Sequence, residues 1–352
     1  MAPYASMFDE FVDIPAAAII TVSDSEVPQS KDLSSLRSLA LNTSPPPPSD
    51  AWSENQKCSP IGKGGWSHVV PGLITKGKVP IAIKKPAFQN DAKDVLLQEA
   101  KVLGYIKLAG GCDKAGVVEF LGYDSAVGCI LMPHLMGMSL KDYTIYRKKN
   151  GTKVGDTEPV VGLKDWLKIS SQLAETFGYL KKIGVIHGDV SWNNVVISSS
   201  TMKTVVIDFT SGVIDAPDAV PSKVAGAVTT AFVAPELLEA HFDDNGRLLR
   251  DDEDKPSPTY ASDMYGLGMT LLAVAIGQEA YHNAGQYQGV YARQGIPLEY
   301  AKSGENGGVV GVKTPVTRAL EGCFGNTADK RCGVEEFGKR IGEMMEELNL
   351  KK

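Results

Sequence analysis

The chain has 352 residues, of which 43% are hydrophobic and 22% charged, so it can bury a sizeable core and has the composition of a soluble globular protein. Its net charge of −6 excludes the broadly basic surface that binding to nucleic acid or to an anionic membrane requires. The 5 scattered cysteines exclude a disulfide framework or a cysteine-rich zinc site and indicate a reducing, intracellular compartment, either cytoplasm or nucleus.

Residues 1–55 are rich in Ser, Pro and acidic side chains, and prolines occupy positions 45–48. This composition predicts a disordered, acidic and proline-rich tail. The prolines favour an extended polyproline segment, which is either a ligand for a proline-binding domain or a solvated linker. The apolar stretch 14–20 is too short to span a bilayer, so we expect no membrane segment.

From residue 57 the sequence changes to short β-branched runs, and beyond residue 138 helical periodicity dominates. The expected elements up to residue 138 are strands at 67–74 and 79–85, a helix at 91–110, and strands at 117–124 and 128–134. Residues 163–184 form a predicted amphipathic helix, and residues 261–278, apolar on all sides, form a predicted buried helix. A small β-rich part is therefore followed by a larger α-rich part.

A polar loop, HGDVSWNNVVI at residues 187–197, links the long amphipathic helix to a buried strand. A second apolar strand ends at Asp208. Asp189, Asn194 and Asp208 therefore lie at the ends of neighbouring predicted strands, which suits coordination of a hard metal ion by oxygen atoms. On these residues alone, Asp189 and Asn194 could equally cap turns.

Glycines at 62, 64 and 65 lie between strand-like residues, where backbone N–H groups could approach phosphates without obstruction by side chains. A hairpin turn without function is the alternative. Further along, Lys84 lies in an apolar strand and is a candidate inward-facing cation, although a lone lysine after a strand is more often exposed.

In this order, the segments resemble the protein kinase superfamily over about residues 57–345, and within it a divergent branch of the eukaryotic-type Ser/Thr protein kinases. His-Gly-Asp replaces the usual His-Arg-Asp of the catalytic loop, and Asp-Phe-Thr replaces Asp-Phe-Gly. The resemblance implies an α+β fold of two lobes within a kinase domain at 56–346. The small β-rich N-lobe would span about 56–135, and the larger α-helical C-lobe about 136–346.

The resemblance also implies roles for individual residues. Asp189 is expected to be the catalytic base, Lys84 to contact the phosphates of ATP, and Glu99 to pair with Lys84. Asn194 and Asp208 are expected to bind Mg²⁺. The residues expected to bind ATP come from the glycine-rich loop, the sheet and the hinge: Gly62, Gly64, Val69, Ala82, Lys84, Met132, Pro133, Leu135 and Val196.

Other matches concern residues that support the site. Glu236 of the Ala-Pro-Glu motif would pair with Arg331, and Asp263 resembles the buried acid beneath the catalytic loop. His187 is expected to pack near Phe209 and Leu103 rather than to act in catalysis.

Three positions depart from the family pattern. Gly188 replaces the loop arginine, so no guanidinium is available there to bind a phosphorylated activation segment. Ser191 stands where Ser/Thr kinases have a lysine, which removes positive charge near the transferred phosphate. Thr210 replaces a glycine and reduces backbone freedom at a position that often acts as a hinge.

We therefore expect an ATP-dependent protein kinase that transfers the γ-phosphate to Ser or Thr hydroxyl groups of a protein substrate, with Mg²⁺ as cofactor. An ATP-binding pseudokinase that acts as a scaffold is one alternative, indicated by the loss of charge at Ser191. Small-molecule kinases of the aminoglycoside and choline type, which share the His-Gly-Asp motif, are the other. The Ala-Pro-Glu motif, Arg331 and Thr229 favour a protein substrate.

Overall fold

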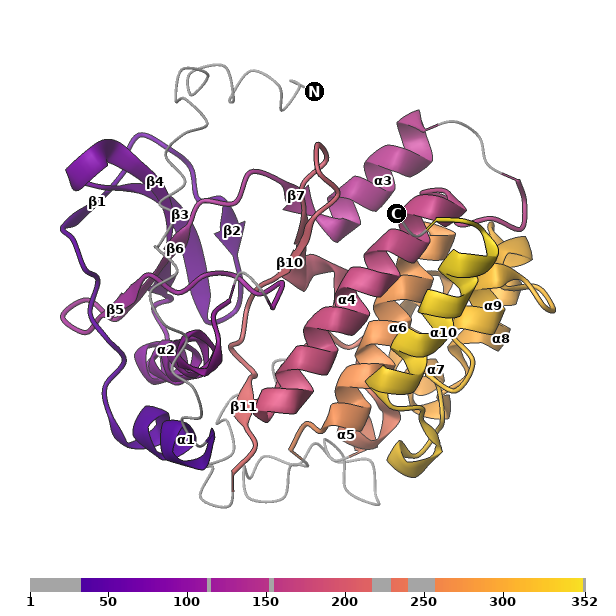
Figure 1. Cartoon of the computed structure of the whole chain (residues 1–352). Coiled ribbons are helices and arrows are strands. Elements are labelled where there is room, and N and C mark those ends of the chain that lie inside the picture. Colours follow the sequence, from indigo (N-terminus) through magenta and orange to yellow (C-terminus); the bar gives the residue numbers. More distant parts are fainter. Residues whose placement is uncertain (1–32, 113–114, 152–154, 217–228, 240–256, 351–352) are drawn as a thin grey trace.

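Two lobes of different composition lie side by side in the computed structural model, which describes residues 33–112, 115–151, 155–216, 229–239 and 257–350. One lobe is built on a β-sheet and one long helix, and the other is mainly helical (Figure 1). This is the two-lobed α+β kinase fold that the resemblance implies. No helix of the described residues is both long and apolar enough to cross a membrane.

The N-lobe sheet has the strand order β1-β3-β4-β6-β5, with β2 paired to β3, and its pairings are antiparallel. Its strands are β1 (Trp52–Glu54), β2 (Gly62–Lys63), β3 (Ser67–Ile74), β4 (Val79–Pro86), β5 (Gly122–Asp124) and β6 (Cys129–Pro133). Successive side chains of a strand point to opposite faces. Ile81 and Ile83 of β4 therefore join a small apolar cluster on one face, whereas Ala82 and Lys84 point to the other.

Helix α2 (Ala92–Ala109) packs against strands β4, β5 and β6. Its buried face combines apolar side chains such as Leu96 and Leu103 with the carboxylate of Glu99. The N-lobe therefore holds one acidic side chain inside an otherwise apolar contact, close to the strand that carries Lys84.

The C-lobe is organised around α6, in which every residue from Ser262 to Ile276 is buried. This confirms the predicted buried helix, and the amphipathic helix predicted at 163–184 is also present as α4. The helices of the described C-lobe residues are α3 (Leu140–Asn150), α4 (Leu163–Ile183), α5 (Pro235–Glu239), α6 (Tyr260–Ile276), α7 (Gln288–Gln294), α8 (Pro297–Lys302), α9 (Pro315–Ala319) and α10 (Val334–Glu347).

Two small sheets position the polar loop between the lobes. The first has the order β10-β9-β7 and the second pairs β11 with β8. Their strands are β7 (Met138–Ser139), β8 (Val185–Ile186), β9 (Val195–Ile197), β10 (Thr204–Val206) and β11 (Val213–Ile214). The loop leaves β8 and enters β9 through a 3₁₀ turn, Trp192–Asn194, so its two ends are fixed by different sheets.

The prediction of a disordered tail over residues 1–55 is wrong for residues 33–54. Residues 33–42 form helix α1 (Leu33–Asn42), which packs against α2, and β1 pairs with β3. Residues 1–32 lie outside the described residues. In the proline run, Pro45 is buried, and the carbonyl of Pro46 accepts a hydrogen bond of 2.9 Å from the N–H of Tyr123. The run is thus engaged within this chain, which leaves the predicted proline-binding partner without support.

The strand predicted at 117–124 is much shorter in the structure, where only Gly122–Asp124 forms a strand. Residues 116–118 instead pair with β10 of the C-lobe: Val118 N–H donates to Val206 at 2.9 Å, and Val206 N–H donates to Gly116 at 2.8 Å. The β-branched residues there do form an extended pairing, but with a partner from the other lobe.

Candidate functional site

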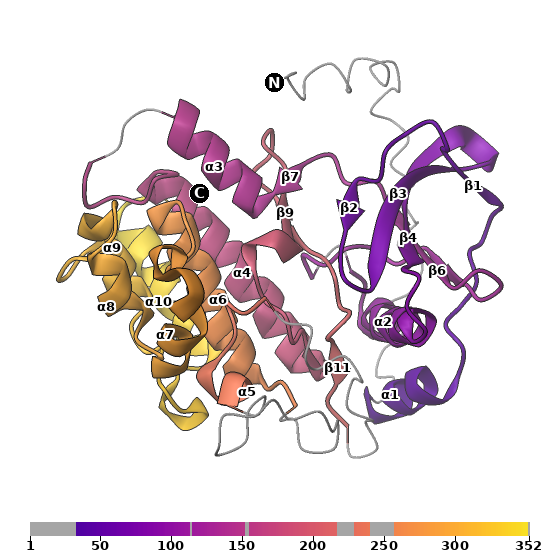
Figure 2. The same cartoon turned by 180° about the vertical axis from the view of Figure 1, so that it is seen from behind.

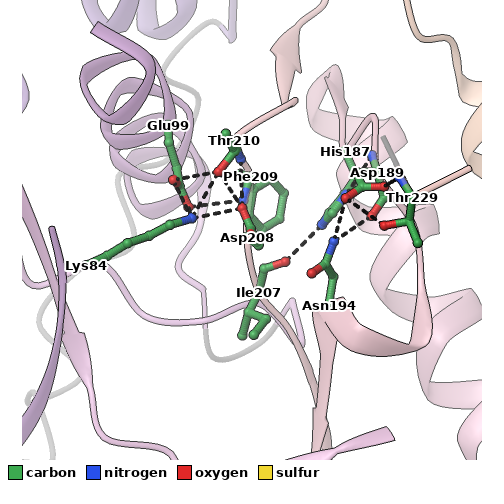
Figure 3. A network of polar contacts seen from close by, with 10 residues as sticks. All are labelled: Lys84, Glu99, His187, Asp189, Asn194, Ile207, Asp208, Phe209, Thr210 and Thr229. Atoms are coloured by element: carbon green, nitrogen blue, oxygen red, sulfur yellow. Dashed lines mark hydrogen bonds and ion pairs between the residues drawn. The ribbon is translucent and has the colours of Figure 1, made fainter. Parts of the chain in front are cut away.

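A buried ion pair joins the two main elements of the N-lobe. Nζ of Lys84, on β4, lies 2.8 Å from Oε1 and 2.7 Å from Oε2 of Glu99, on α2. The side chains are only 4% and 1% exposed, so each charge needs partners within the protein to offset the cost of its burial. Figure 3 shows the lysine reaching from its strand to the helix.

The same ammonium group contacts the segment that follows β10. Nζ lies 2.8 Å from Oδ1 of Asp208 and 3.0 Å from Oγ1 of Thr210 (Figure 3). Asp208 has a φ of 65°, a backbone conformation that residues other than glycine rarely adopt and that is often found at functional sites. Three elements far apart in the sequence therefore converge on one ammonium group.

Thr210 adds a hydroxyl group to this cluster, whereas the sequence predicts only a loss of backbone freedom at this position. Its Oγ1 lies 3.1 Å from Oε2 of Glu99 and also forms a short hydrogen bond with Oδ1 of Asp208. A hydroxyl group has one proton, so it can donate to only one of these carboxylates at a time while it accepts from Lys84. The sequence signal for these contacts is the hydroxyl group of Thr210, because the glycine usual at this position in the family has no side chain.

The electrostatics of the cluster keep Lys84 and Asp208 charged at neutral pH, whereas burial raises the pKa of Glu99 against the opposing charge of Lys84. Burial lowers the pKa of the Lys84 ammonium, but the negative charges of Asp208 and Glu99 outweigh burial and raise that pKa above its ordinary value. Burial raises the pKa of Asp208, but the charge and hydrogen bond of Lys84 and the hydroxyl of Thr210 prevail and lower it to about 2. Lys84 is therefore cationic and Asp208 anionic.

Across from this cluster, Asp189 is held by its neighbours in the loop and by Thr229 (Figure 3). Its Oδ1 accepts the backbone N–H of Thr229 at 3.0 Å, and its Oδ2 accepts Nδ2 of Asn194 at 3.0 Å. Nδ2 of Asn194 also donates to the backbone carbonyl of Asp189 at 2.8 Å. Burial raises the pKa of Asp189, and the hydrogen bond from Thr229 offsets part of that rise. Such a carboxylate is a stronger proton acceptor than an exposed one.

Asp263 of α6 holds the start of the polar loop through hydrogen bonds to its backbone. Its oxygens accept the backbone N–H groups of His187 at 2.7 Å and of Gly188 at 2.9 Å. Burial raises the pKa of Asp263 to about 6, against the opposing effects of His187 and of these hydrogen bonds. The ring of His187 lies 4.7 Å from that of Phe209, and its Nε2 lies 3.0 Å from the carbonyl oxygen of Ile207, which agrees with the predicted packing role.

The donor atoms of Asp208 and Asn194 fit a magnesium ion. Asp208 is 39% exposed at its side chain, and its Oδ2 makes no hydrogen bond to the described residues. Since Nδ2 of Asn194 is directed to Asp189, its Oδ1 is the oxygen left for a ligand. Within the described ranges, no group of three His, Cys, Asp or Glu side chains could hold a metal alone. Mg²⁺ commonly binds through one or two protein oxygens together with substrate phosphates and water, so this donor set suits it.

The residues predicted to bind ATP are only partly brought together. Pro133, Leu135 and Val196 border one cavity of about 270 Å³ beside the hinge. The sheet register places Ala82 opposite Met132 and Val69 opposite Lys84, so the others lie on neighbouring strands, but they do not line that cavity. The cavity extends instead toward β10.

The glycine-rich loop leaves room next to its backbone. Gly62 is opposite Val69 in the pairing of β2 with β3. A Cβ atom added at Gly65 would meet no atom within 4 Å, and one at Gly64 would meet only the carbonyl oxygen of Ser67, at 3.7 Å. The tip of the loop is tied down by Gln89, whose Nε2 donates to the Gly65 carbonyl at 2.9 Å. An anion could therefore approach this backbone without meeting side chains.

The structure also explains why the basic side chains usual in the family are absent at two positions, Gly188 and Ser191. Gly188 has a φ of 79°, and a Cβ atom there would lie 2.4 Å from the carbonyl oxygen of Ser211. Ser191 is fully buried, and its hydroxyl group has no hydrogen-bond partner among the described residues. Neither position has space for a long cationic side chain without a local rearrangement.

Arg331 and Glu236 form the predicted ion pair. Nη1 and Nη2 of Arg331 lie 2.7 Å and 2.6 Å from the two carboxylate oxygens of Glu236, and Nε donates to the carbonyl of Gly325 at 2.8 Å. The guanidinium group also lies 5.0 Å from the centre of the Tyr265 ring. This bidentate pair fixes the start of α5, just after Thr229, against the rest of the C-lobe.

Comparisons with known proteins agree with this geometry. Residues 55–339 match the family model described as "Protein kinase domain". Similar curated proteins are "Mitogen-activated protein kinase kinase kinase 5" of Homo sapiens, 24% identical over 70% of this chain, and "Serine/threonine-protein kinase ISR1" of Saccharomyces cerevisiae, 22% identical over 63%. Another is "Serine/threonine-protein kinase PknK" of Mycobacterium bovis, 25% identical over 63%. The aligned regions cover 16%, 51% and 17% of these relatives, respectively.

Proposed function

This chain belongs to the protein kinase family, and from that membership we propose that it transfers the γ-phosphate of ATP, with Mg²⁺, to Ser or Thr hydroxyl groups of a protein substrate. The Ser/Thr preference is supported by the similar yeast and mycobacterial proteins, which are named as serine/threonine-protein kinases.

One set of contacts supports the proposal most: Lys84 bonds at the same time to Glu99 and to Asp208. Phosphoryl transfer needs little covalent chemistry from the protein and depends on positioned charges. Because Glu99 fixes the flexible lysine, its ammonium group presents a charge at a defined place for the phosphates. Asp208, with a low pKa of about 2, stays ionised as a metal ligand.

Asp189 is the proposed proton acceptor. Its carboxylate is oriented by Asn194 and Thr229, and its raised pKa favours acceptance of the proton that the substrate hydroxyl loses. Asn194 and Asp208 would hold Mg²⁺, which supplies neutralisation of charge on the phosphate oxygens. The open backbone of the glycine-rich loop would cover the phosphates, and the residues around Ala82 and Met132 would contact adenine.

The test uses the full-length protein with γ-labelled ATP, Mg²⁺ and peptide mixtures that carry Ser, Thr or Tyr as the only acceptor. Asp189→Asn and Asp208→Asn should each abolish transfer, since both remove a charge without changing side-chain size. Asp156→Asn, at an exposed carboxylate outside the site, is the matched control and should retain the wild-type rate. Nucleotide binding is measured in parallel by calorimetry.

Three results would contradict the proposal. Full activity of Asp208→Asn would remove Asp208 from the site. Binding of ATP and Mg²⁺ without transfer to any acceptor would favour a pseudokinase scaffold. Transfer to choline or an aminoglycoside, with none to peptides, would favour a small-molecule kinase.

A further inference from the structure

Helix α1 lies outside the region that matches the protein kinase family, which begins at residue 55, yet it is packed into the main core. Leu36 and Ala40 of α1 are buried in the same apolar cluster as Leu103 of α2. Both views show α1 directly beside α2 and close to β11 (Figures 1 and 2). This segment therefore covers a surface of the helix that carries Glu99.

Arg37 of α1 makes polar contacts with three separate parts of the kinase domain. Its Nε lies 3.2 Å from the hydroxyl oxygen of Tyr105 on α2, and its Nη2 donates to the carbonyl of Ile183 at 3.2 Å. Its Nη1 donates to the carbonyl of Asp215, just beyond β11, at 3.0 Å. The hydroxyl of Tyr105 in turn donates to the same Ile183 carbonyl at 2.6 Å. One guanidinium group thus links α1, α2, the end of α4 and the start of the segment after Asp-Phe-Thr.

The end of α4 is shaped to receive this cation. The last carbonyl groups of a helix lack intrahelical partners and carry partial negative charge, which favours a guanidinium group. Gly184, which follows α4, has a φ of 75°, and a Cβ atom there would lie 2.2 Å from Nη2 of Arg37. The positive φ therefore favours glycine at this turn, and any side chain there would displace the guanidinium group of Arg37.

A second contact runs between α1 and α2. Nζ of Lys101, on α2, donates to the carbonyl of Leu41 at the end of α1, at 2.8 Å. Lys101 and Tyr105 are one helical turn apart, so they attach neighbouring points of α2 to α1 and to α4. Glu99 lies on the same helix, and its bond to Lys84 requires that α2 stay close to β4.

We propose that α1 is a built-in positioning element for the catalytic site and that Arg37 is a positioning residue, which acts through Tyr105 to hold α2, and therefore Glu99, against Lys84. The proposal rests on the proposed kinase function for its effect on turnover. It gives this chain a means to keep α2 in place without a phosphate on the activation segment, which Gly188 could not bind.

The experiment compares full-length wild type with Arg37→Ala, Arg37→Lys, Tyr105→Phe and the double variant Arg37→Ala/Tyr105→Phe. Arg318→Ala, at an exposed arginine of α9 that pairs with Glu347, is the matched control. The measurements are kcat and KM for ATP, hydrogen exchange of the α2 and α6 amides, and thermal unfolding. Exchange requires no turnover, so it still tests the contact if the protein transfers no phosphate.

Arg37→Ala should lower kcat/KM by about tenfold or more and speed exchange in α2 while exchange in α6 is unchanged. Arg37→Lys retains one donor group, so its kcat/KM and its exchange rate in α2 should lie between those of Arg37→Ala and wild type. Because both residues act through one contact, the double variant should lose little more than the worse single variant.

Unchanged exchange in α2 for Arg37→Ala would overturn the proposal. So would faster exchange in α2 and α6 alike, since that result describes a general loss of stability. Full additivity in the double variant would show that Arg37 does not act through Tyr105. If wild type transfers no phosphate but α2 exchange still depends on Arg37, the proposed kinase function fails and the positioning role stands.

Discussion

Substitution of Thr210 by valine tests the cluster around Lys84, in which the hydroxyl group of Thr210 was not predicted to take part. Valine has nearly the same shape as threonine, so the change removes the hydroxyl group and little else. That hydroxyl contacts Glu99, Lys84 and Asp208. We expect slower phosphate transfer, because Lys84 and Glu99 lose a shared partner that restricts their relative motion.

The size of the effect follows from the partners that remain. Lys84 keeps its bonds to Glu99 and Asp208, and Glu99 keeps Lys84 and the backbone N–H of Phe209. No charge is left unpaired, so the cost is that of a hydrogen bond to charged groups, about 1.5–3 kcal/mol. If the loss is expressed in the transition state, kcat/KM falls by roughly 10- to 150-fold.

The assay measures kcat and KM for ATP at saturating peptide, with thermal unfolding as a check on the fold. Thr210→Ser is the matched control, because it keeps the hydroxyl group and removes only a methyl group. It should stay close to wild type. Activity of Thr210→Val within about twofold of wild type would refute the reasoning. An equal loss in Thr210→Ser would show that the methyl group, rather than the hydroxyl, matters.

Four further predictions concern Asp263 and Gly188, which support the catalytic loop, and Arg331, which holds the start of α5. The kcat of wild type should fall as pH drops through about 6, where Asp263 takes up a proton and loses the charge that binds two backbone N–H groups. The pKa of Asp263 is raised on folding, so the contribution of Asp263 to the free energy of unfolding should become less favourable as pH rises from 3.8 to about 6. Denaturant unfolding of wild type and Asp263→Asn across this pH range measures the effect. A difference between the two proteins that does not change with pH would contradict the prediction. Gly188→Arg and Gly188→Ala should both reduce activity and melting temperature, because any Cβ would meet the Ser211 carbonyl; a fully active Gly188→Ala would disprove the steric explanation. Arg331→Lys should lower the free energy of unfolding by about 2 kcal/mol, because lysine cannot bond to both oxygens of Glu236, and an unchanged urea midpoint would count against this.

Several features of the fold could be predicted because they depend on local periodicity. The alternation in residues 79–85 places Lys84 on the face opposite Ile81 and Ile83, as the structure shows. The all-round apolar pattern of residues 261–278 required burial, and α6 is buried from Ser262 to Ile276. The family pattern associated Lys84 with Glu99 and Asp208, and the structure brings these side chains into contact; their roles in catalysis remain predictions.

Other features depend on contacts between distant segments, which no local pattern contains. Residues 33–42 lie in a tail rich in serine and proline; Leu33, Leu36 and Ala40 have the spacing of one helix face, but the partner that buries Leu36 and Ala40 is α2, which no local pattern identifies. The hydroxyl of Thr210 bonds to Glu99, which is 111 residues away in the sequence, and to Lys84, which is 126 residues away. The family pattern identifies Ser191 only as a position that lacks the usual positive charge, and it does not contain the complete burial of Ser191 that the structure shows.

The strap formed by residues 33–54 has a consequence for the speed at which products leave. It contacts the C-lobe through Arg37 and enters the N-lobe sheet as β1, and its helix α1 lies away from the connection between β6 and β7, near the other end of the boundary between the lobes (Figure 1). With the lobes joined at both ends, rotation of one against the other should be restricted, so ADP would dissociate slowly. Release, rather than the chemical step, would then limit turnover. Rapid-mixing experiments would show this as a burst of phosphorylated peptide in the first turnover, and a first turnover without a burst would contradict it.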